Sequence, residues 1–220
     1  MTSPPAASRR NFIRNTVLLS TSLGTLPFLQ QGLQAHPTPP EEGLHIIGPK
    51  AGFSPQVGTL VSMMNWMRAT VLRSVTKLST PDLDHLLDAN ANSIGAMLLH
   101  LAATETFYQA NTFEGRGDFN EAEKKQFGAA MSLGDEGRKV IKGHELNYYL
   151  DQLKEVREKT LAEFKNRDDK WLMTVDPKFF GDQPTNNYCK WFHVAEHESN
   201  HNGQIKYIKS RLPGAKAGND

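Results

Sequence analysis

The 220-residue sequence contains a single cysteine, Cys189. A chain with one cysteine cannot form an internal disulfide, so its stability has to come from a packed core and, where one is bound, from a metal ion. We interpret Cys189 as a small buried apolar residue at the start of a helix, rather than as a nucleophile or a metal ligand.

The sequence also lacks a strong excess of charge of either sign. It has 25 Lys and Arg against 24 Asp and Glu, which gives a formal net charge of +1. No basic arm and no interleaving of basic with aromatic residues is present, and this argues against nucleic acid as a partner. The length is sufficient for one soluble domain with a sizeable core.

The N-terminal segment has an apolar stretch that is too short for a membrane span, which needs roughly 20 residues. Arg9 and Arg10 precede a run of about a dozen apolar-leaning residues, and Ala35 lies near a plausible cleavage point. This pattern is typical of an export signal, and the paired arginines indicate the twin-arginine type. We therefore expect residues 1–35 to be a signal peptide.

Removal of this signal would change the net charge from +1 to −2, because the segment holds three arginines and no acid. The expected location is periplasmic or secreted, with no stable membrane span after signal removal. An uncleaved N-terminal anchor is the alternative interpretation.

The remaining sequence predicts an all-α protein. Residues 36–55 are rich in proline and glycine, which predicts a linker or a surface arm. Apolar residues then recur at helical spacing in long segments, and no alternating strand pattern is present. The long segments are 56–78, 93–113, 146–164 and 186–212. We expect a bundle of four long antiparallel helices over residues 56–213, with short extra helices after Ser79 and over 120–131, and a disordered tail over 214–220.

The sequence HVAEHESNH places His193, His197 and His201 at four-residue spacing. Residues four apart lie on the same face of an α-helix, so a neighbouring pair can direct both imidazoles at one ion. Three successive turns span about 12 Å, which is too far for all three to bind one ion. One of the two outer histidines must therefore have another role. A shared cation would satisfy several buried imidazoles together.

Two coordination schemes compete for these residues. In a zinc protease, His197 and His201 would be ligands and Glu198 would be the general base. The 19 residues that follow His201 contain no His or Glu that could supply the usual downstream ligand. The other scheme takes the third ligand from His100, which stands within the apolar face of the 93–113 segment. Three histidines from two helices describe an open site for zinc or a similar divalent ion.

The catalytic residues cannot be chosen from the spacing alone, and three candidates stand beside the predicted ligands. His193 is a candidate for proton transfer at one end of the site. Glu105 is a candidate hydrogen-bond acceptor behind the ligands. Glu198 points about 100° away from His197 on a helix, so we favour a solvent-facing or interhelical position for it over the role of general base.

Two motifs in this sequence resemble those of the DinB-like (DinB/YfiT-like) superfamily of metalloenzymes. They are SIGAMLLHLAATETFY and FHVAEHESNHNGQIKYI. In that superfamily, one histidine of the second helix and an H-x-x-x-H pair followed by Gly-Gln-Ile bind a divalent metal. The first ligand matches His100, the pair matches His197 and His201, and the tail matches residues 203–205.

The resemblance covers roughly residues 57–212 and implies a four-helix bundle with a long crossover, often dimeric. It also implies a divalent metal cofactor, zinc first, with nickel, iron or manganese as alternatives. The better-understood relatives are thiol-dependent enzymes, including bacillithiol and mycothiol S-transferases and a maleylpyruvate isomerase.

We therefore expect an exported metal-dependent enzyme, a thiol S-transferase or a hydrolase, that acts on a small-molecule substrate and can form a homodimer. A non-catalytic metal-binding or stress-related protein is the alternative, and a secreted HExxH zinc protease is a less favoured one.

Overall fold

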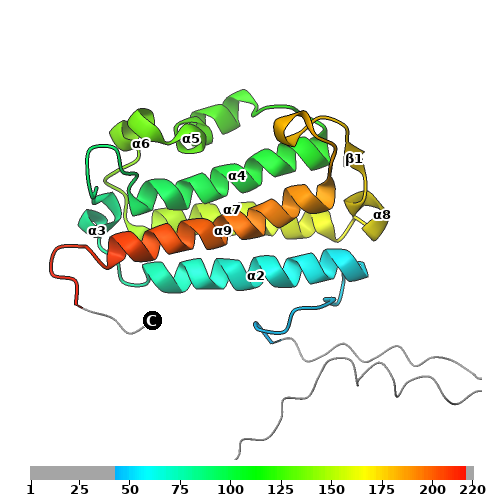
Figure 1. The fold of residues 1–220 in the computed structure, drawn as a ribbon, viewed down its shortest axis with the longest axis horizontal. Coiled ribbons are helices and arrows are strands. Elements are labelled where there is room, and N and C mark those ends of the chain that lie inside the picture. Colours follow the sequence, from blue (N-terminus) through cyan, green and yellow to red (C-terminus); the bar gives the residue numbers. More distant parts are fainter. Residues whose placement is uncertain (1–42, 217–220) are drawn as a thin grey trace, which may run out of the picture. The chain divides into compact units, whose positions relative to one another are not determined.

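The computed structural model describes residues 43–216. The predicted signal peptide, the first part of the predicted arm and the last four residues lie outside this range. The long helices are α2 (Pro55–Val75), α4 (Ile94–Glu114), α7 (Leu146–Phe164) and α9 (Asn187–Lys209). The short helices are α3 (Thr80–Asp84), α5 (Glu121–Ser132), α6 (Gly134–Val140) and α8 (Asp169–Leu172). The prediction of an all-α fold with four long helices is confirmed (Figure 1).

One small β-ribbon and three short helical elements, α6, α8 and η1, were not predicted. Strand β1 (Val175–Asp176) pairs antiparallel with β2 (Thr185–Asn186), and a short 3-10 helix, η1 (Phe180–Asp182), lies between them. These strands have two residues each, too few to leave an alternating pattern. Helix α6 was missed for a similar reason. It has only seven residues, which is fewer than two helical turns, and its sequence GDEGRKV includes two glycines.

Polar side chains fix the starts of several helices where the sequence predicts them. Ser79, Ser93 and Asn186 each accept a hydrogen bond from a backbone N–H in the first turn of α3, α4 and α9. Such caps satisfy donors that have no partner inside the helix. Helix α4 ends at Gly115, whose φ of 67° belongs to the left-handed region that favours glycine.

The prediction that all four long helices pack antiparallel is wrong for two pairs. Arg68 contacts Glu198, and further along both helices Ser74 contacts Lys209, so α2 and α9 run in the same direction. Helices α4 and α7 are likewise parallel to each other and antiparallel to α2 and α9 (Figure 1). The crossover that contains α5 and α6 returns the chain to the end at which α4 began, and this allows α7 to run beside α4.

The buried apolar residues form two clusters along the bundle. One contains residues from α4, α7 and the C-terminal halves of α2 and α9. The other contains the aromatic residues Tyr108, Phe164 and Trp191 with the N-terminal half of α2. Near the middle of each long helix, between the two clusters, lies one buried charged side chain: Arg68, Glu105, Arg157 and Glu198. The middle of the bundle is therefore polar. Lys190, at the start of α9, is a further buried charge.

Candidate metal centre

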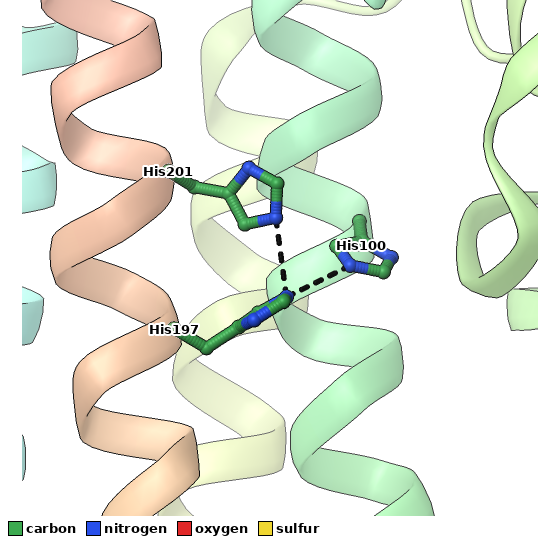
Figure 2. A group of neighbouring side chains, drawn as sticks. All are labelled: His100, His197 and His201. Carbon is green, nitrogen blue, oxygen red and sulfur yellow. Dashed lines mark hydrogen bonds between the residues drawn. The ribbon is translucent and has the colours of Figure 1, made fainter.

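Three histidines from two helices come together on the seam between α4 and α9. The Nε2 atom of His197 lies 2.9 Å from Nε2 of His100 and 3.1 Å from Nε2 of His201 (Figure 2). The candidate ligand atoms all lie within 4.8 Å of one another. Nitrogen ligands of a tetrahedral zinc, each roughly 2.0–2.1 Å from the ion, lie roughly 3.3 Å apart. The spacing of the three imidazoles therefore fits a shared divalent cation.

The hydrogen bonds on the far side of two rings fix which nitrogen carries the proton. The Nδ1 atom of His100 lies 2.9 Å from the carbonyl oxygen of Ala130, which can only accept a hydrogen bond. The Nδ1 atom of His201 lies 2.8 Å from Oε1 of Gln204, which is likewise an acceptor. In the neutral rings, both Nε2 atoms consequently carry lone pairs that face His197.

These lone pairs are not all satisfied by protein groups. Nε2 of His197 has at most one hydrogen, so it can donate to His100 or to His201 but not to both. Three nitrogens therefore converge with at most one proton among them. A cation between the rings would satisfy the remaining lone pairs, and this donor set suits zinc and other ions that bind imidazole.

The surroundings keep the three imidazoles neutral. Burial lowers the pKa of His197 to about 3, with further effects from His201, His100 and His193. Burial and the nearby His100 lower the pKa of His201 to about 4. Burial also lowers the pKa of His100, although the carbonyl of Ala130 acts in the opposite direction. Neutral rings near pH 7 can bind a metal without first losing a proton.

The crossover positions His100. The carbonyl of Ala130 lies in the last turn of α5, where carbonyl groups have no intrahelical donor. Helix α5 ends there because Leu133 has a φ of 53° and Gly134 a φ of 62°. The free carbonyl therefore accepts from the His100 ring, and this links the ligand to a segment about thirty residues away along the chain.

His193 lies beside the three-histidine cluster but is not part of it. Its ring centroid is 5.0 Å from that of His197, and its Nδ1 lies 3.1 Å from Oε2 of Glu196. The edges of its ring also pack against Tyr108 and Phe180, with centroids 6.0 and 5.4 Å away. Of the two outer histidines in the spaced triplet, the structure brings His201 to His100 and His197, and leaves His193 at the end of the row.

Glu105 lies in the core, away from the ligands. It is fully buried, and Arg157 donates to its Oε1 and Oε2 at 2.8 and 3.2 Å. Arg68 and Thr160 also donate to this carboxylate, at 2.9 and 2.7 Å. Burial alone would raise the pKa of Glu105, but the charges of Arg157 and Arg68 outweigh it, so the pKa is lowered. Glu105 therefore stays ionised as part of a charge network.

Glu198 belongs to the same network and is not exposed to solvent. Nη2 of Arg68 and Nη2 of Arg157 donate to its Oε1, at 2.7 and 2.6 Å. The Oε2 atom is buried and has no hydrogen-bond partner among the described residues. The carboxylate is thus interhelical and held by two arginines, an arrangement unlike the general base of a zinc protease.

Cys189 is exposed, so the prediction that it is buried is wrong. It is separated by four-residue steps from His193 and His197, and it therefore lies on their open face of α9 rather than on the face of Trp191 that packs into the core.

Sequence reasoning missed both arginines of the charge network. Arg68 is the one charged residue in α2 before its last turn, where Arg73 lies, and this isolated charge was a usable signal for a buried ion pair. Arg157 stands among the Lys and Glu residues of α7 and resembles its solvent-exposed neighbours.

Comparison with known proteins identifies the family. Residues 59–214 match the mycothiol-S-transferase family. A search of curated proteins finds no significant match. No helix within residues 43–216 is long and apolar enough to cross a membrane. Because the match spans more than half of the sequence and the fold agrees with it, the chain belongs to the mycothiol-S-transferase family, a DinB/YfiT-like family.

Proposed function

We propose that this protein is an exported metal-dependent enzyme that transfers a low-molecular-weight thiol to an electrophilic small molecule. The observation that carries the proposal is the convergence of three neutral imidazoles, from His100, His197 and His201, with more lone pairs than protons among them. The family to which the chain belongs supports the choice of a thiol as substrate.

The three histidines would hold the ion, zinc foremost, and leave part of its coordination open to substrate. A divalent ion bound there would lower the pKa of a thiol and stabilise the thiolate as nucleophile. Ala130 and Gln204 hold two of the rings in the orientation that points Nε2 at the ion.

In the transfer, the thiol loses its proton and the sulfur forms a bond to an electrophilic carbon, whose leaving group departs with its electron pair. We assign acceptance of the thiol proton to His193, which is adjacent to His197 and is held by Glu196. Its position at the end of the histidine row leaves it free of the ligand role.

Export is a separate part of the proposal. It rests on Arg9 and Arg10, on the short apolar run that follows and on Ala35, all of which precede the described residues. A twin-arginine signal suits a protein that folds and takes up its metal before export.

The position of Glu198 argues against the protease alternative. Its carboxylate is turned towards Arg68 and Arg157 in the core, whereas the general base of a metalloprotease has to face the metal and its water. The letters H-E-x-x-H in this chain therefore describe two candidate ligands and one structural acid.

Metal analysis of protein purified from the periplasmic fraction tests both the cofactor and the compartment. We expect about one equivalent of a divalent metal, mainly zinc, in the wild-type protein. His100→Ala should lose most of this metal. His85 lies at the C-terminal end of α3 and is not part of the histidine cluster, so the control His85→Ala should retain the metal. Replacement of Arg9 and Arg10 by lysine should leave the protein in the cytoplasm.

A full equivalent of metal in His100→Ala would contradict the ligand assignment. With the metal-loaded protein, a panel of small thiols and a bimane electrophile should show thiol conjugation above the uncatalysed rate. Stoichiometric metal without any conjugation across the panel would favour a non-catalytic metal-binding protein.

A further inference from the structure

The loop between α8 and α9, residues 173–186, places an aromatic ring beside the histidine row. This loop contains β1, η1 and β2, and it lies near the end of α4 and the start of α9 (Figure 1). The ring of Phe180, in η1, has its centroid 5.4 Å from that of His193, with the two ring planes at 86°. The centroid of His193 is itself 5.0 Å from that of His197. The loop therefore reaches the end of the row at which the proposed proton acceptor lies.

Phe180 is not part of the core. It is 38% exposed and belongs to neither of the two apolar clusters in the described part of the chain. Its neighbour Phe179, in contrast, packs against Phe107 and Tyr108 at the edge of the second cluster. Single exposed apolar side chains are common on protein surfaces, so exposure alone would carry no argument. The argument comes from the position of this ring next to His193 and from the way in which the loop is held.

Several contacts fix the loop on the bundle. Lys190 donates to Oδ2 of Asp176 at 2.9 Å, and its Nζ lies 3.9 Å from the centroid of the Phe179 ring. Strand β1 pairs with β2. Asp182, at the end of η1, has a φ of 59°, a conformation that is uncommon for residues other than glycine. The protein therefore holds Phe180 beside His193 before any ligand binds, so ligand binding does not have to order this side chain.

The surroundings of His193 suit a flat apolar group. The centroid of Tyr108 lies 6.0 Å from that of His193, at 87°, so two aromatic rings from different elements contact this imidazole. Aromatic rings attract one another at centroid separations of about 4.5–7 Å, and burial of their apolar surface adds to the attraction. The side chain of Phe180 has no hydrogen-bond donor or acceptor with which to bind a polar ligand.

We propose that Phe180 binds an aromatic group of the electrophile and thereby places the carbon that the thiol attacks beside His193. The inference rests on the proposed function, because it takes the thiol site to lie at His100, His197 and His201. It adds a substrate class: electrophiles that carry an aromatic ring next to the reacting carbon, in preference to small polar ones.

Calorimetric titration of the zinc-loaded protein with two products of thiol transfer tests this proposal. The probes are 2-(benzylthio)ethanol, which carries an aromatic ring, and 2-(methylthio)ethanol, which does not. Both have the same thioether and hydroxyl groups. We expect the wild-type protein to bind the benzyl compound at least about tenfold more tightly, since contact with Phe180 removes apolar surface of both rings from water.

Phe180→Ala should reduce this preference by about tenfold. The variant should stay folded and keep one equivalent of zinc, because Phe180 is exposed and is not a candidate ligand. Phe180→Trp keeps an aromatic ring and should keep the preference.

Phe192→Ala is the matched control. Phe192 is 49% exposed and directly precedes His193, so its side chain lies about 100° away around α9. Loss of this ring should leave the preference unchanged.

Equal affinity of the wild-type protein for both thioethers would overturn the inference, and so would an unchanged preference in Phe180→Ala. An equal loss of preference in Phe192→Ala would also overturn it, because the ring would then bind without regard to the loop. Failure of the proposed function gives a different result, in which the wild-type protein holds no metal or conjugates no thiol to any electrophile.

Discussion

His197 is the residue on which the candidate centre depends most. Its Nε2 faces the Nε2 atoms of both His100 and His201, and its pKa, lowered to about 3, lies below the pKa of about 4 of His201. The burial that keeps this ring neutral also removes it from water, so in the metal-free protein its lone pair or proton is only partly satisfied. Without a cation, the three buried imidazoles therefore stabilise the folded protein less than apolar side chains in the same positions would.

The lowered histidine pKa values predict a pH-dependent stability of the metal-free protein. An unfolded histidine has a pKa near 6.5, whereas folding lowers the pKa of His197 to about 3 and that of His201 to about 4. Between these values the unfolded chain binds more protons, so the free energy of unfolding falls as the pH drops from about 6.5 towards about 4. The slope is up to about 1.4 kcal/mol per pH unit for each histidine.

Urea denaturation in the presence of a chelator at several pH values between 7 and 4.5 measures this dependence. Replacement of His197 and His201 together by asparagine should flatten it, whereas His85→Asn should leave it close to wild type. If the double variant has the same slope as the wild-type protein, acid sensitivity arises elsewhere.

At the scale of residues, helical periodicity was sufficient to predict the candidate metal ligands. The spacing of His197 and His201 and the apolar surroundings of His100 are local patterns, and the structure places these three side chains together. The orientation of Glu198 and the burial of Arg157 depend on partners 41 positions or more away in the sequence, so no local pattern contains them. The exposure of Cys189 depends likewise on which face of α9 is covered.

Among the elements, the arm that precedes α2 packs closely against that helix. The backbone N–H of Gly48 donates to Oγ of Ser62 at 3.1 Å. A Cβ atom added to Gly58 would lie 2.4 Å from the backbone nitrogen of Lys50. Because the neighbour is backbone rather than the end of a flexible side chain, the arm and α2 could not both keep their positions. The segment is thus an arm laid on the helix over its described residues.

Two Gly→Ala substitutions should consequently have opposite effects. Gly58→Ala should lower the free energy of unfolding by about 1–3 kcal/mol because of this contact. Gly128, within α5, has nothing within 4 Å of the position of an added Cβ. Gly128→Ala should raise the free energy of unfolding by about 0.5–1 kcal/mol, since alanine is the better helix former. Denaturation curves measured side by side show both, and a stabilised Gly58→Ala variant would mean that the arm does not pack on α2.

The long helices could be predicted because each has several turns of apolar periodicity, whereas their relative directions could not. The crossover contains α5 and α6, whose short and partly polar sequences give weak signals. The sequence predicts a short helix over 120–131 within this connection, but it indicates neither α6 nor the end of the bundle to which the chain returns. Helix α5, which the sequence does predict, also provides the Ala130 carbonyl for His100, but this contact joins residues 30 positions apart and no local pattern contains it.

For the molecule as a whole, the charge network ties the four long helices to one another. Arg68 on α2, Glu105 on α4, Arg157 on α7 and Glu198 on α9 contribute two positive and two negative charges, and all four are buried. The network lies between the two apolar clusters, near the level of the histidines on α4 and α9. It can therefore fix how α4 and α9 are placed along each other, which the spacing of the three imidazoles requires.

Removal of one cation from this network should destabilise the whole bundle. Arg157→Met keeps much of the side-chain volume but leaves Glu105 and Glu198 to share Arg68, so buried negative charge is no longer balanced. We expect a loss of about 3–5 kcal/mol in the free energy of unfolding, as for other buried ion pairs that lose one partner. Urea denaturation at pH 7 measures it.

Lys154→Met, on the same helix, is the matched control. Lys154 is exposed, and its pair with Glu158 spans 3.9 Å, so its loss should change stability by no more than about 0.5 kcal/mol. If Arg157→Met were no more destabilising than Lys154→Met, the network would not hold the helices together. Arg157→Met also tests whether the network positions the metal ligands. Arg157 contacts no candidate ligand. A lowered zinc affinity in folded Arg157→Met protein would therefore show that the network sets the distance between His100 and the pair on α9.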